Sequence, residues 1–359
     1  MEPEERLVPL RTKGSTSVAR VTDDWYVACL ASELGQKPRR VTILGEPLVL
    51  FRDDGGEVGA LLDRCPHRNV PLSLGRVRDG NLECAYHGWQ FDRGGACTHV
   101  PGLKANGASS ADRRVESFAC REQDGLVWVY MTADAEPERD PFKMPLVGVD
   151  GYTTVTERVS AQASLHATAE NALDVPHTAF LHGGLFRTDD KERNPIDVVV
   201  RRYHDRVEAE YIGEPRPTGL VGKILAPKGG VVKHFDRFIM PCVVQVEYGL
   251  GNSHFVVSAA LTPVSDFVTE LYAVISFKLP VPGFVVVPFL RPIAMRIFGQ
   301  DAVVLSRQTD TIRHFGGEQY MSTEIDVVGN HILRLLRDAE RGTRKAPGEP
   351  LEKKLTMMV

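Results

Sequence analysis

Two short segments in the first hundred residues each pair one cysteine with one histidine. The first reads C-P-H and ends at His67, the second reads C-A-Y-H and ends at His87, and sixteen residues separate them. Thiolates and imidazoles are the side chains that hold zinc ions and iron–sulfur clusters in proteins. The segments therefore predict a metal centre carried by two loops, with Cys65, His67, Cys84 and His87 as its ligands.

The order of these ligands distinguishes two kinds of centre. A zinc finger groups like ligands, a cysteine pair followed by a histidine pair, whereas each loop here supplies one of each. In a [2Fe–2S] cluster, one iron would take Cys65 and Cys84, and the other would take His67 and His87. Neutral imidazoles in place of two thiolates raise the reduction potential of such a cluster. The pattern favours this cluster over a Cys₂His₂ zinc site.

Short strands broken by turns surround both loops. Residues 46–65 predict a hairpin around Asp53–Gly56, residues 88–102 predict another around Gly94–Gly95, and residues 125–131 predict a final strand. Several short strands at this spacing indicate a small all-β sandwich or barrel.

The later part of the chain mixes helices and strands. We expect helices over 163–182, 300–315 and 324–341, and antiparallel strands over 234–277. Strands grouped apart from helices indicate an α+β domain. The apolar segment 279–290 contains three prolines and is shorter than the roughly 20 residues of a spanning helix. It predicts a buried or substrate-facing loop and strand, with a peripheral membrane contact as the alternative.

Composition agrees with two folded domains and excludes some partners. The chain has 359 residues, 43% of them hydrophobic, and a net charge of -4. This charge gives no electrostatic case for nucleic acid or an anionic membrane. The N-terminus lacks an apolar signal region, so we expect a cytoplasmic protein. The predicted divisions are a tail (1–22), an all-β domain (23–135), a linker (136–150), an α+β domain (151–345) and a second tail (346–359).

A second segment, E-N-A-L-D-V-P-H-T-A-F-L-H over residues 170–182, carries two histidines. Side chains five positions apart in an ideal helix point about 140° apart. His177 and His182 can therefore meet one ion only where the helix bends, and Pro176 supplies a cause for a bend. Taken alone, this segment favours two structural histidines.

Together the two patterns resemble the Rieske non-haem iron oxygenases. The segments W-Y-V at residues 25–27, C-P-H-R, C-A-Y-H-G-W and F-D-R-G-G-A-C-T-H-V-P-G are similar to the Rieske domain of that family. In the family, the two Cys/His pairs hold a [2Fe–2S] cluster. The second loop of the family usually has a proline where this chain has Ala85, a position that is not a ligand. The resemblance covers about residues 23–340.

The resemblance also implies a mononuclear iron site. In the family, two histidines and one carboxylate hold the iron and leave positions open for dioxygen and substrate. His177 and His182 match the histidines, and Asp301 matches the carboxylate in a D-x-x-x-x-x-x-Q pattern. Asp174 matches an aspartate that bonds the first iron histidine and reaches a cluster histidine of the neighbouring subunit. Asn171 matches a residue near the iron.

A member of this family would be the terminal oxygenase of a multicomponent system. It would carry one [2Fe–2S] cluster and one mononuclear Fe(II) per chain, form a homotrimer and have no integral membrane span. Electrons would come from a separate reductase or ferredoxin, because no Gly-rich dinucleotide fingerprint opens a βαβ unit in this sequence.

The expected reaction uses O2 to hydroxylate, demethylate or N-oxygenate an apolar aromatic or polycyclic small molecule. Two alternatives remain at this point. One is a Rieske-type electron-transfer protein without oxygenase activity, for which the all-β domain alone would suffice. The other is a binding module stabilised by zinc.

Overall fold

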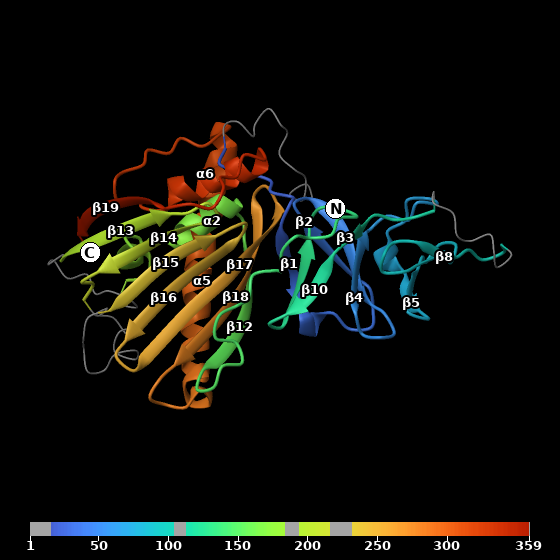
Figure 1. The fold of residues 1–359 in the computed structure, drawn as a ribbon, viewed down its shortest axis with the longest axis horizontal. Helices are drawn as coiled ribbons and strands as arrows, with labels where there is room; N and C mark the ends of the chain where they lie inside the picture. The colour runs from blue at the N-terminus through green and yellow to red at the C-terminus, as the bar shows by residue number, and fades with distance from the viewer. Residues whose placement is uncertain (1–15, 104–112, 184–193, 216–231, 359) are drawn as a thin grey trace. The chain divides into compact units, whose positions relative to one another are not determined.

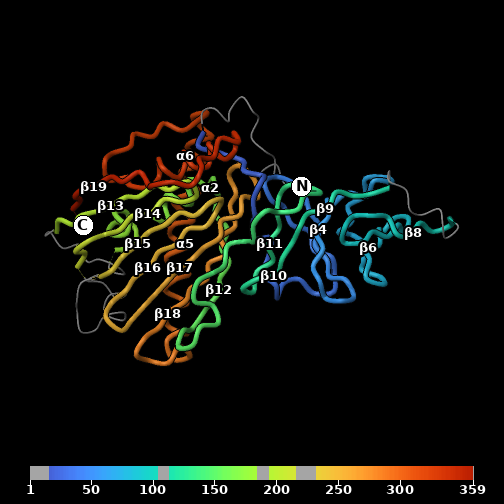
Figure 2. The backbone as a smooth tube through the Cα atoms, viewed as in Figure 1, coloured from blue at the N-terminus to red at the C-terminus, as the bar shows by residue number. Residues whose placement is uncertain are grey.

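The computed structural model describes residues 16–103, 113–183, 194–215 and 232–358 (Figures 1 and 2). The chain divides into two compact units. Residues 22–143 form one unit, and the described part of residues 1–21 joins residues 144–358 in the other. This division falls inside the segment that was predicted as a linker.

The unit of residues 22–143 contains only strands and short helical turns in its described part. Its three sheets hold the following strands in spatial order: β1 (Trp25–Leu30), β11 (Leu126–Tyr130) and β10 (Cys120–Gln123); β2 (Arg39–Ile43), β3 (Glu46–Arg52), β4 (Val58–Leu62) and β9 (Ser117–Phe118); β5 (Arg76–Arg78), β6 (Asn81–Glu83), β7 (Gln90–Phe91) and β8 (Cys97–His99). The predicted hairpins are confirmed as β3–β4 and β7–β8. The cysteine–histidine loops follow β4 and β6.

The other unit is built on one antiparallel sheet of eight strands. In spatial order these are β12 (Thr153–Ala161), β18 (Val268–Lys278), β17 (Ser253–Ser265), β16 (Val243–Leu250), β15 (Lys233–Ile239), β14 (Arg206–Ile212), β13 (Pro195–Arg202) and β19 (Leu351–Met358). Its described helices are α2 (Leu165–Ala172), α3 (Thr178–Leu181), α5 (Gly283–Phe315) and α6 (Gly329–Glu340). Figure 1 shows α5 running along the sheet behind the strands. An all-β domain followed by an α+β domain is the predicted fold class, and it is confirmed.

Small and apolar side chains hold α2 and α5 against this sheet. Ala161 at the end of β12, Ala167 of α2 and Leu305 of α5 belong to one buried cluster. On its other side α2 contacts α6, where His166 Nε2 lies 2.9 Å from the carbonyl oxygen of Gly329. Small residues allow these close approaches, and the packing fixes the helices that carry the second motif.

Parts of both predicted tails belong to the folded α+β unit. Residues 351–358 form β19, which pairs with β13 along its whole length. Its first four residues are exposed and three of them, Glu352, Lys353 and Lys354, are charged. Such a sequence suits an edge strand, but by itself it resembles a tail. At the other end, Ser17 bonds Glu318, and Arg20 pairs with Asp266 at 2.6 Å. These contacts attach residues 16–21 to the α+β unit.

The helix predictions need three corrections. The segment 279–290 is not a loop and strand, because α5 begins at Gly283 and includes Pro288 and Pro292. Phe284 and Phe289 of this helix are exposed, so water can reach the carbonyl groups that the prolines leave without a backbone donor. The predicted helix 163–182 is interrupted between α2 and α3, and the helix predicted over 324–341 begins only at Gly329. None of the described helices is long and apolar enough to cross a membrane.

Candidate metal centres

The two cysteine–histidine loops have the same backbone construction. The amide of Cys65 donates to the carbonyl of Val70, and the amide of Cys84 donates to the carbonyl of Trp89, five residues further on in each case. The carbonyl of each cysteine accepts a bond from the fourth residue after it, Asn69 or Gly88. Both of these residues have a positive φ, 60° and 68°, a conformation that asparagine and glycine adopt most readily. Local sequence thus shapes two equivalent loops.

The loops place their thiols inside and their imidazoles toward solvent. Cys65 and Cys84 are 2% and 3% exposed, whereas His87 is exposed and His67 is partly exposed. Burial raises the pKa of the Cys65 thiol to about 11, although the backbone amides of His67 and Arg68 donate to its sulfur and oppose this rise. Adjacent buried thiols with amide donors suit a positively charged metal centre, which favours their thiolate forms.

The two histidine rings lie together at the outer edge of the loops. The ring centroids of His67 and His87 are 4.5 Å apart, and the His67 ring stacks on Trp89 with a centroid distance of 4.8 Å. The Nδ1 atom of His67 is buried and has no hydrogen-bond partner. An imidazole nitrogen without a partner beside a second histidine is consistent with metal ligation on that side.

The spacing of these four residues fits a two-iron centre better than one zinc ion. Zinc holds four ligands at about 2.0–2.3 Å, so all its ligand atoms lie within about 4 Å of one another. In the described part of the chain, no three ligand atoms of these residues lie within 4.8 Å of one another. The chain therefore offers a thiol pair and an imidazole pair, as a [2Fe–2S] cluster with two ligands on each iron requires.

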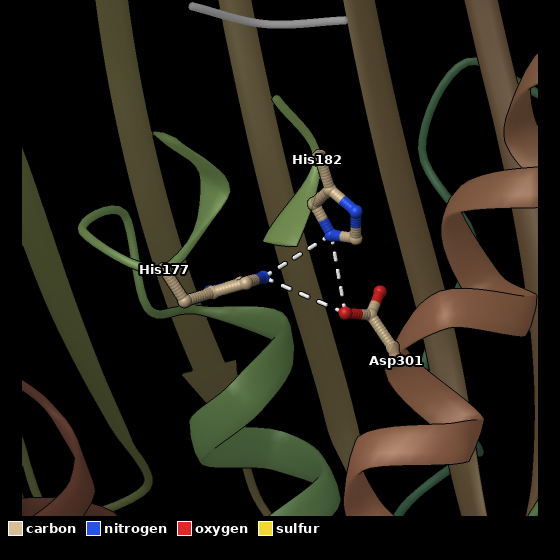
Figure 3. A group of neighbouring side chains, drawn as sticks. All are labelled: His177, His182 and Asp301. Carbon is tan, nitrogen blue, oxygen red and sulfur yellow. Dashed lines mark hydrogen bonds and ion pairs between the residues drawn. The ribbon is translucent and has the colours of Figure 1, made fainter. Parts of the chain in front are cut away.

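The histidines of the second motif meet Asp301 in a compact group (Figure 3). Nε2 of His177 lies 3.3 Å from Nε2 of His182 and 3.5 Å from Oδ1 of Asp301. Nε2 of His182 lies 3.1 Å from the same carboxylate oxygen. Ligands about 2.1 Å from one ion and at right angles to each other lie about 3 Å apart. The three atoms thus fit one face of a divalent cation.

A break in the helix brings the two histidines together. Helix α2 ends at Ala172, and His177 and His182 stand at the two ends of the single turn α3. Pro176 lies in the break, where it cannot donate a backbone hydrogen bond. The bend that the sequence requires for a shared ion is therefore present, and it is a full interruption. Asp301 comes from the middle of α5, on the opposite side of the group (Figure 3).

Each histidine also has a polar side chain near its other nitrogen. Nδ1 of His177 lies 3.4 Å from Oδ2 of Asp174, and Nδ1 of His182 lies 3.0 Å from Oε1 of Gln300. An acceptor at Nδ1 fixes the tautomer that carries its proton there and directs Nε2 toward a metal. The sequence analysis assigned Asp174 this role on the basis of resemblance, but it missed Gln300.

The charges of the group also favour a cation. Burial lowers the pKa of His177, but the carboxylates of Asp174 and Asp301 outweigh this effect and raise it to about 9. Burial raises the pKa of Asp301, and bonds from His177 and His182 more than offset this, so its pKa is lowered. Two carboxylates that attract a proton to this site will also attract a metal ion, which must displace that proton.

The group opens on an apolar cavity of about 190 Å³ between the sheet and helices α2 and α5. His177, His182 and Asp301 line one part of it, together with Asn171 and Asp174. Most other lining residues are aliphatic or aromatic: Val159, Val244, Val246, Phe255, Val257, Leu271, Ile297, Phe298 and Leu305. This is the arrangement of a small-molecule site, apolar with few polar groups.

A second polar group in this cavity was not singled out from the sequence. It consists of His234, Glu214 and Asp236, which line the cavity. A signal was present in the sequence, because His234 and Asp236 are alternate residues of a strand whose inward face is otherwise apolar.

These features define a class of protein. One unit presents paired thiols and imidazoles for an iron–sulfur cluster, and the other presents two histidines and a carboxylate beside an apolar cavity. Two family models match the chain in the same order. Residues 24–119 match the Rieske [2Fe-2S] domain, and residues 161–341 match the vanillate O-demethylase oxygenase C-terminal domain.

Comparison with individual proteins gives the same result. The oxygenase component of dicamba O-demethylase from Stenotrophomonas maltophilia is 40% identical over 183 residues, which cover 50% of this chain and 53% of that protein. The vanillate O-demethylase oxygenase subunit of a Pseudomonas species is 26% identical over 338 residues, or 87% of this chain and 92% of that protein. The crystal structure of dicamba monooxygenase bound to dicamba matches with a TM-score of 0.75 at 28% identity, covering 90% of this chain and 98% of that one.

The chain belongs to the Rieske non-haem iron oxygenases, with a C-terminal domain of the vanillate O-demethylase type. The cofactors of this family are a [2Fe–2S] cluster and a mononuclear iron, and the two groups of side chains described above fit them. For several curated relatives, including the dicamba enzyme, the matched region spans only about half of the relative's length.

Proposed function

We propose that this protein is the terminal oxygenase of a multicomponent Rieske system. The observation that carries the proposal is the group of His177, His182 and Asp301 on the wall of an apolar cavity. An electron-transfer protein would need only the all-β unit, and neither the cavity nor the second set of metal ligands would have a role in it. The zinc-binding alternative is likewise disfavoured by the separate thiol and imidazole pairs.

In this proposal Cys65, Cys84, His67 and His87 hold the cluster, and His177, His182 and Asp301 hold the iron. The cluster supplies electrons one at a time, and the iron supplies the chemistry of dioxygen activation. The chain's own contribution is positioning. Asp174 and Gln300 orient the iron histidines, and the aliphatic walls keep water away from a substrate held beside the three ligands.

Electrons would come from a separate reductase or ferredoxin and pass between subunits of a homotrimer. We assign Asp174 to this passage, bridging His177 of its own chain to His87 of a neighbouring copy. Its side chain is 34% exposed while it contacts His177, so one carboxylate can meet both partners. A head-to-tail interface that closes on itself produces a ring, as a trimer requires. The cytoplasmic location stays a prediction.

The substrate that fits the cavity is an apolar aromatic or polycyclic small molecule. Relatives of this chain include enzymes named as O-demethylases, a dioxygenase and a sterol monooxygenase. We propose oxidation of such a molecule by hydroxylation, demethylation or N-oxygenation. Asn171 lines the cavity with the iron ligands, and we place it among the residues that contact the substrate or the iron.

Selective removal of each metal centre tests the proposal. His182→Ala and Asp301→Ala should lose the mononuclear iron and all product formation but keep the visible spectrum of the cluster. Cys84→Ser should lose that spectrum. His204→Ala, a partly exposed histidine outside the cavity, is the matched control and should keep both metals. Metal content, absorbance and product formation from an aromatic and polycyclic panel with a surrogate reductase are the readouts.

Two outcomes would contradict parts of the proposal. Loss of the cluster spectrum in His182→Ala would show that the second site is wrongly assigned. A wild-type protein that holds the cluster but no mononuclear iron, and transfers electrons without forming product from any compound, would favour the electron-transfer alternative.

A further inference from the structure

A second cavity lies beside the one that contains the metal ligands. Its volume is about 140 Å³, and that of the first cavity is about 190 Å³. Four side chains line both cavities: Phe255 and Val257 of β17, and Ile297 and Phe298 of α5. These side chains form the boundary between the two spaces, which are therefore direct neighbours between the sheet and α5.

The two cavities follow one another along the strands of the sheet. On β12, Val155 lines the second cavity and Val159 lines the first. On β18, Ile275 is opposite Val155 and lines the second cavity, whereas Leu271 is opposite Val159 and lines the first. Both strands thus place the second cavity at the same end of the first one.

Helix α5 has the same order. Asp301 and Leu305 line the first cavity, whereas Leu290 and Ala294 line the second. At 1.5 Å per residue, Ala294 and Leu290 lie about 10 Å and 16 Å from Asp301 along the helix axis. The two cavities are therefore successive parts of one path that starts at the metal ligands and runs between α5 and the sheet.

The walls of the second cavity suit an uncharged apolar group. Among the described residues that line it, only Glu157 and Arg291 are charged. They pair with each other, because Nε of Arg291 lies 2.5 Å from Oε1 of Glu157 and its Nη2 lies 3.2 Å from Oε2. A paired carboxylate and guanidinium leave no net charge for a charged ligand to meet. The other lining residues are aliphatic or aromatic.

The volumes indicate how large a molecule fills the path. In another protein, an engineered cavity of roughly 150 Å³ with apolar walls binds one benzene molecule. By that measure, the first cavity holds one ring with small substituents and the second holds about one further ring. A substrate with a single ring leaves the second cavity empty, and its walls then lack the contacts that a longer molecule provides.

We propose that the second cavity is a binding subsite for the far end of an elongated, uncharged substrate with at least two rings in line. The inference rests on the proposed oxygenase function and adds the shape of the substrate. The group to be oxidised lies beside His177, His182 and Asp301. The body of the molecule passes Phe298 at the boundary, and its far end lies against Ala294.

Three uncharged methoxy compounds test this inference. They are 4-methylanisole, which has one ring, 4-methoxybiphenyl, which has two rings in line, and 2-methoxybiphenyl, an isomer whose second ring lies beside the methoxy group. Equilibrium dialysis measures their binding to the full-length protein with both metal centres, without reductase. Burial of one further ring should make 4-methoxybiphenyl bind about tenfold to a hundredfold more tightly than 4-methylanisole. It should also bind about tenfold or more tightly than its isomer, which controls for hydrophobicity.

Variants then locate the preference. Ala294→Phe places a ring in the second cavity and should reduce the affinity for 4-methoxybiphenyl about tenfold or more, with that for 4-methylanisole unchanged. Met295→Phe is the control, because Met295 is 37% exposed and lines neither cavity. It should keep the wild-type preference. Circular dichroism and the cluster absorbance verify folding, and Val155→Phe, which fills the cavity from the sheet, carries the test if Ala294→Phe fails to fold.

The inference is overturned if 4-methoxybiphenyl binds no more tightly than 4-methylanisole or than its isomer, or if its binding is not measurable. It is also overturned if the cavity-filling variants fold and keep the wild-type preference. Because these measurements need no turnover, they separate the two proposals. Oxidation of 4-methylanisole without a preference for the longer probe would support the oxygenase function and contradict the subsite, whereas the preference without any product would do the reverse.

Discussion

At the scale of single residues, each histidine of the proposed iron site has a polar side chain near its Nδ1 atom, Asp174 at 3.4 Å from His177 and Gln300 at 3.0 Å from His182. Asp174 was predicted from its place in the motif, but Gln300 was not. Gln300 is next to Asp301, and adjacent residues of a helix point about 100° apart. Sequence periodicity therefore gives no reason to place both side chains at one site. They reach it because they meet different nitrogens of the same ring: Gln300 lies at Nδ1 of His182 and Asp301 lies at Nε2.

Replacing Gln300 should weaken iron binding without removing a ligand. Gln300→Leu leaves His182 Nδ1 without its acceptor, and loss of such an acceptor typically costs about 10- to 100-fold in metal affinity. We expect lower iron occupancy by elemental analysis and an unchanged cluster spectrum. Gln300→Glu, which keeps an acceptor oxygen, should retain most of the iron. Wild-type iron affinity in Gln300→Leu would show that the bond between Gln300 and His182 has no role in ligation.

At the scale of secondary-structure elements, local pattern predicted the strands well and the ends of elements poorly. The hairpins β3–β4 and β7–β8 were expected from their turn residues, because glycine and aspartate at a turn specify its geometry locally. The strand β19 was missed because its charged sequence is explained only by its place at the sheet edge. The early part of α5 was missed because two prolines lie in a helix whose surface is exposed at that point.

The pairing of β19 leads to a test with two neighbouring methionines. Met357 is 3% exposed and Met358 is 54% exposed, because adjacent side chains of a strand point to opposite faces. Met357→Asp would bury a carboxylate without a partner and should lower the free energy of unfolding by about 2–4 kcal/mol. Met358→Asp should change it by less than about 0.5 kcal/mol. Denaturant unfolding of both variants is the measurement, and equal effects would mean that β19 does not pair as described.

At the scale of the whole molecule, the proposed function requires two metal centres in different units and a route between chains. Asp174→Ala should keep the cluster and, in the presence of excess Fe(II), the iron, yet lose turnover, because it removes the proposed bridge between His177 and His87 of the neighbouring copy. Product formation at the wild-type rate in Asp174→Ala would contradict this bridge. Metal content of the same sample shows whether a loss of turnover comes from loss of iron.

Two inactive chains should complement each other if electrons cross between subunits. The His182→Ala chain should lack the iron, and the Cys84→Ser chain should lack the cluster. Mixed trimers can be isolated with a different affinity tag on each chain. In such a ring, one of the three interfaces joins an intact cluster to an intact iron. We expect about a third of wild-type turnover per ring. Trimers of either variant alone should be inactive. Mixed trimers with no activity would contradict the proposed route between subunits.

The sequence by itself determined the kind of metal chemistry and the order of the two domains. Cys65, His67, Cys84 and His87 lie in two short loops whose geometry depends on residues four or five positions away, so a linear pattern is enough to propose them as cluster ligands. His177 and His182 were also proposed as metal ligands, but only resemblance to a family distinguished them from structural histidines.

Only the tertiary structure decided which side chains share the cavity. Asp301 and Gln300 are more than a hundred residues from the histidines they meet, and His234, Glu214 and Asp236 face them from the sheet. Such contacts arise when helices α2 and α5 pack on the inward face of the strands, and this packing is set by many side chains acting together. The substrate shape that we infer depends on that packing, because the length of a cavity belongs to its assembled walls and not to any single segment.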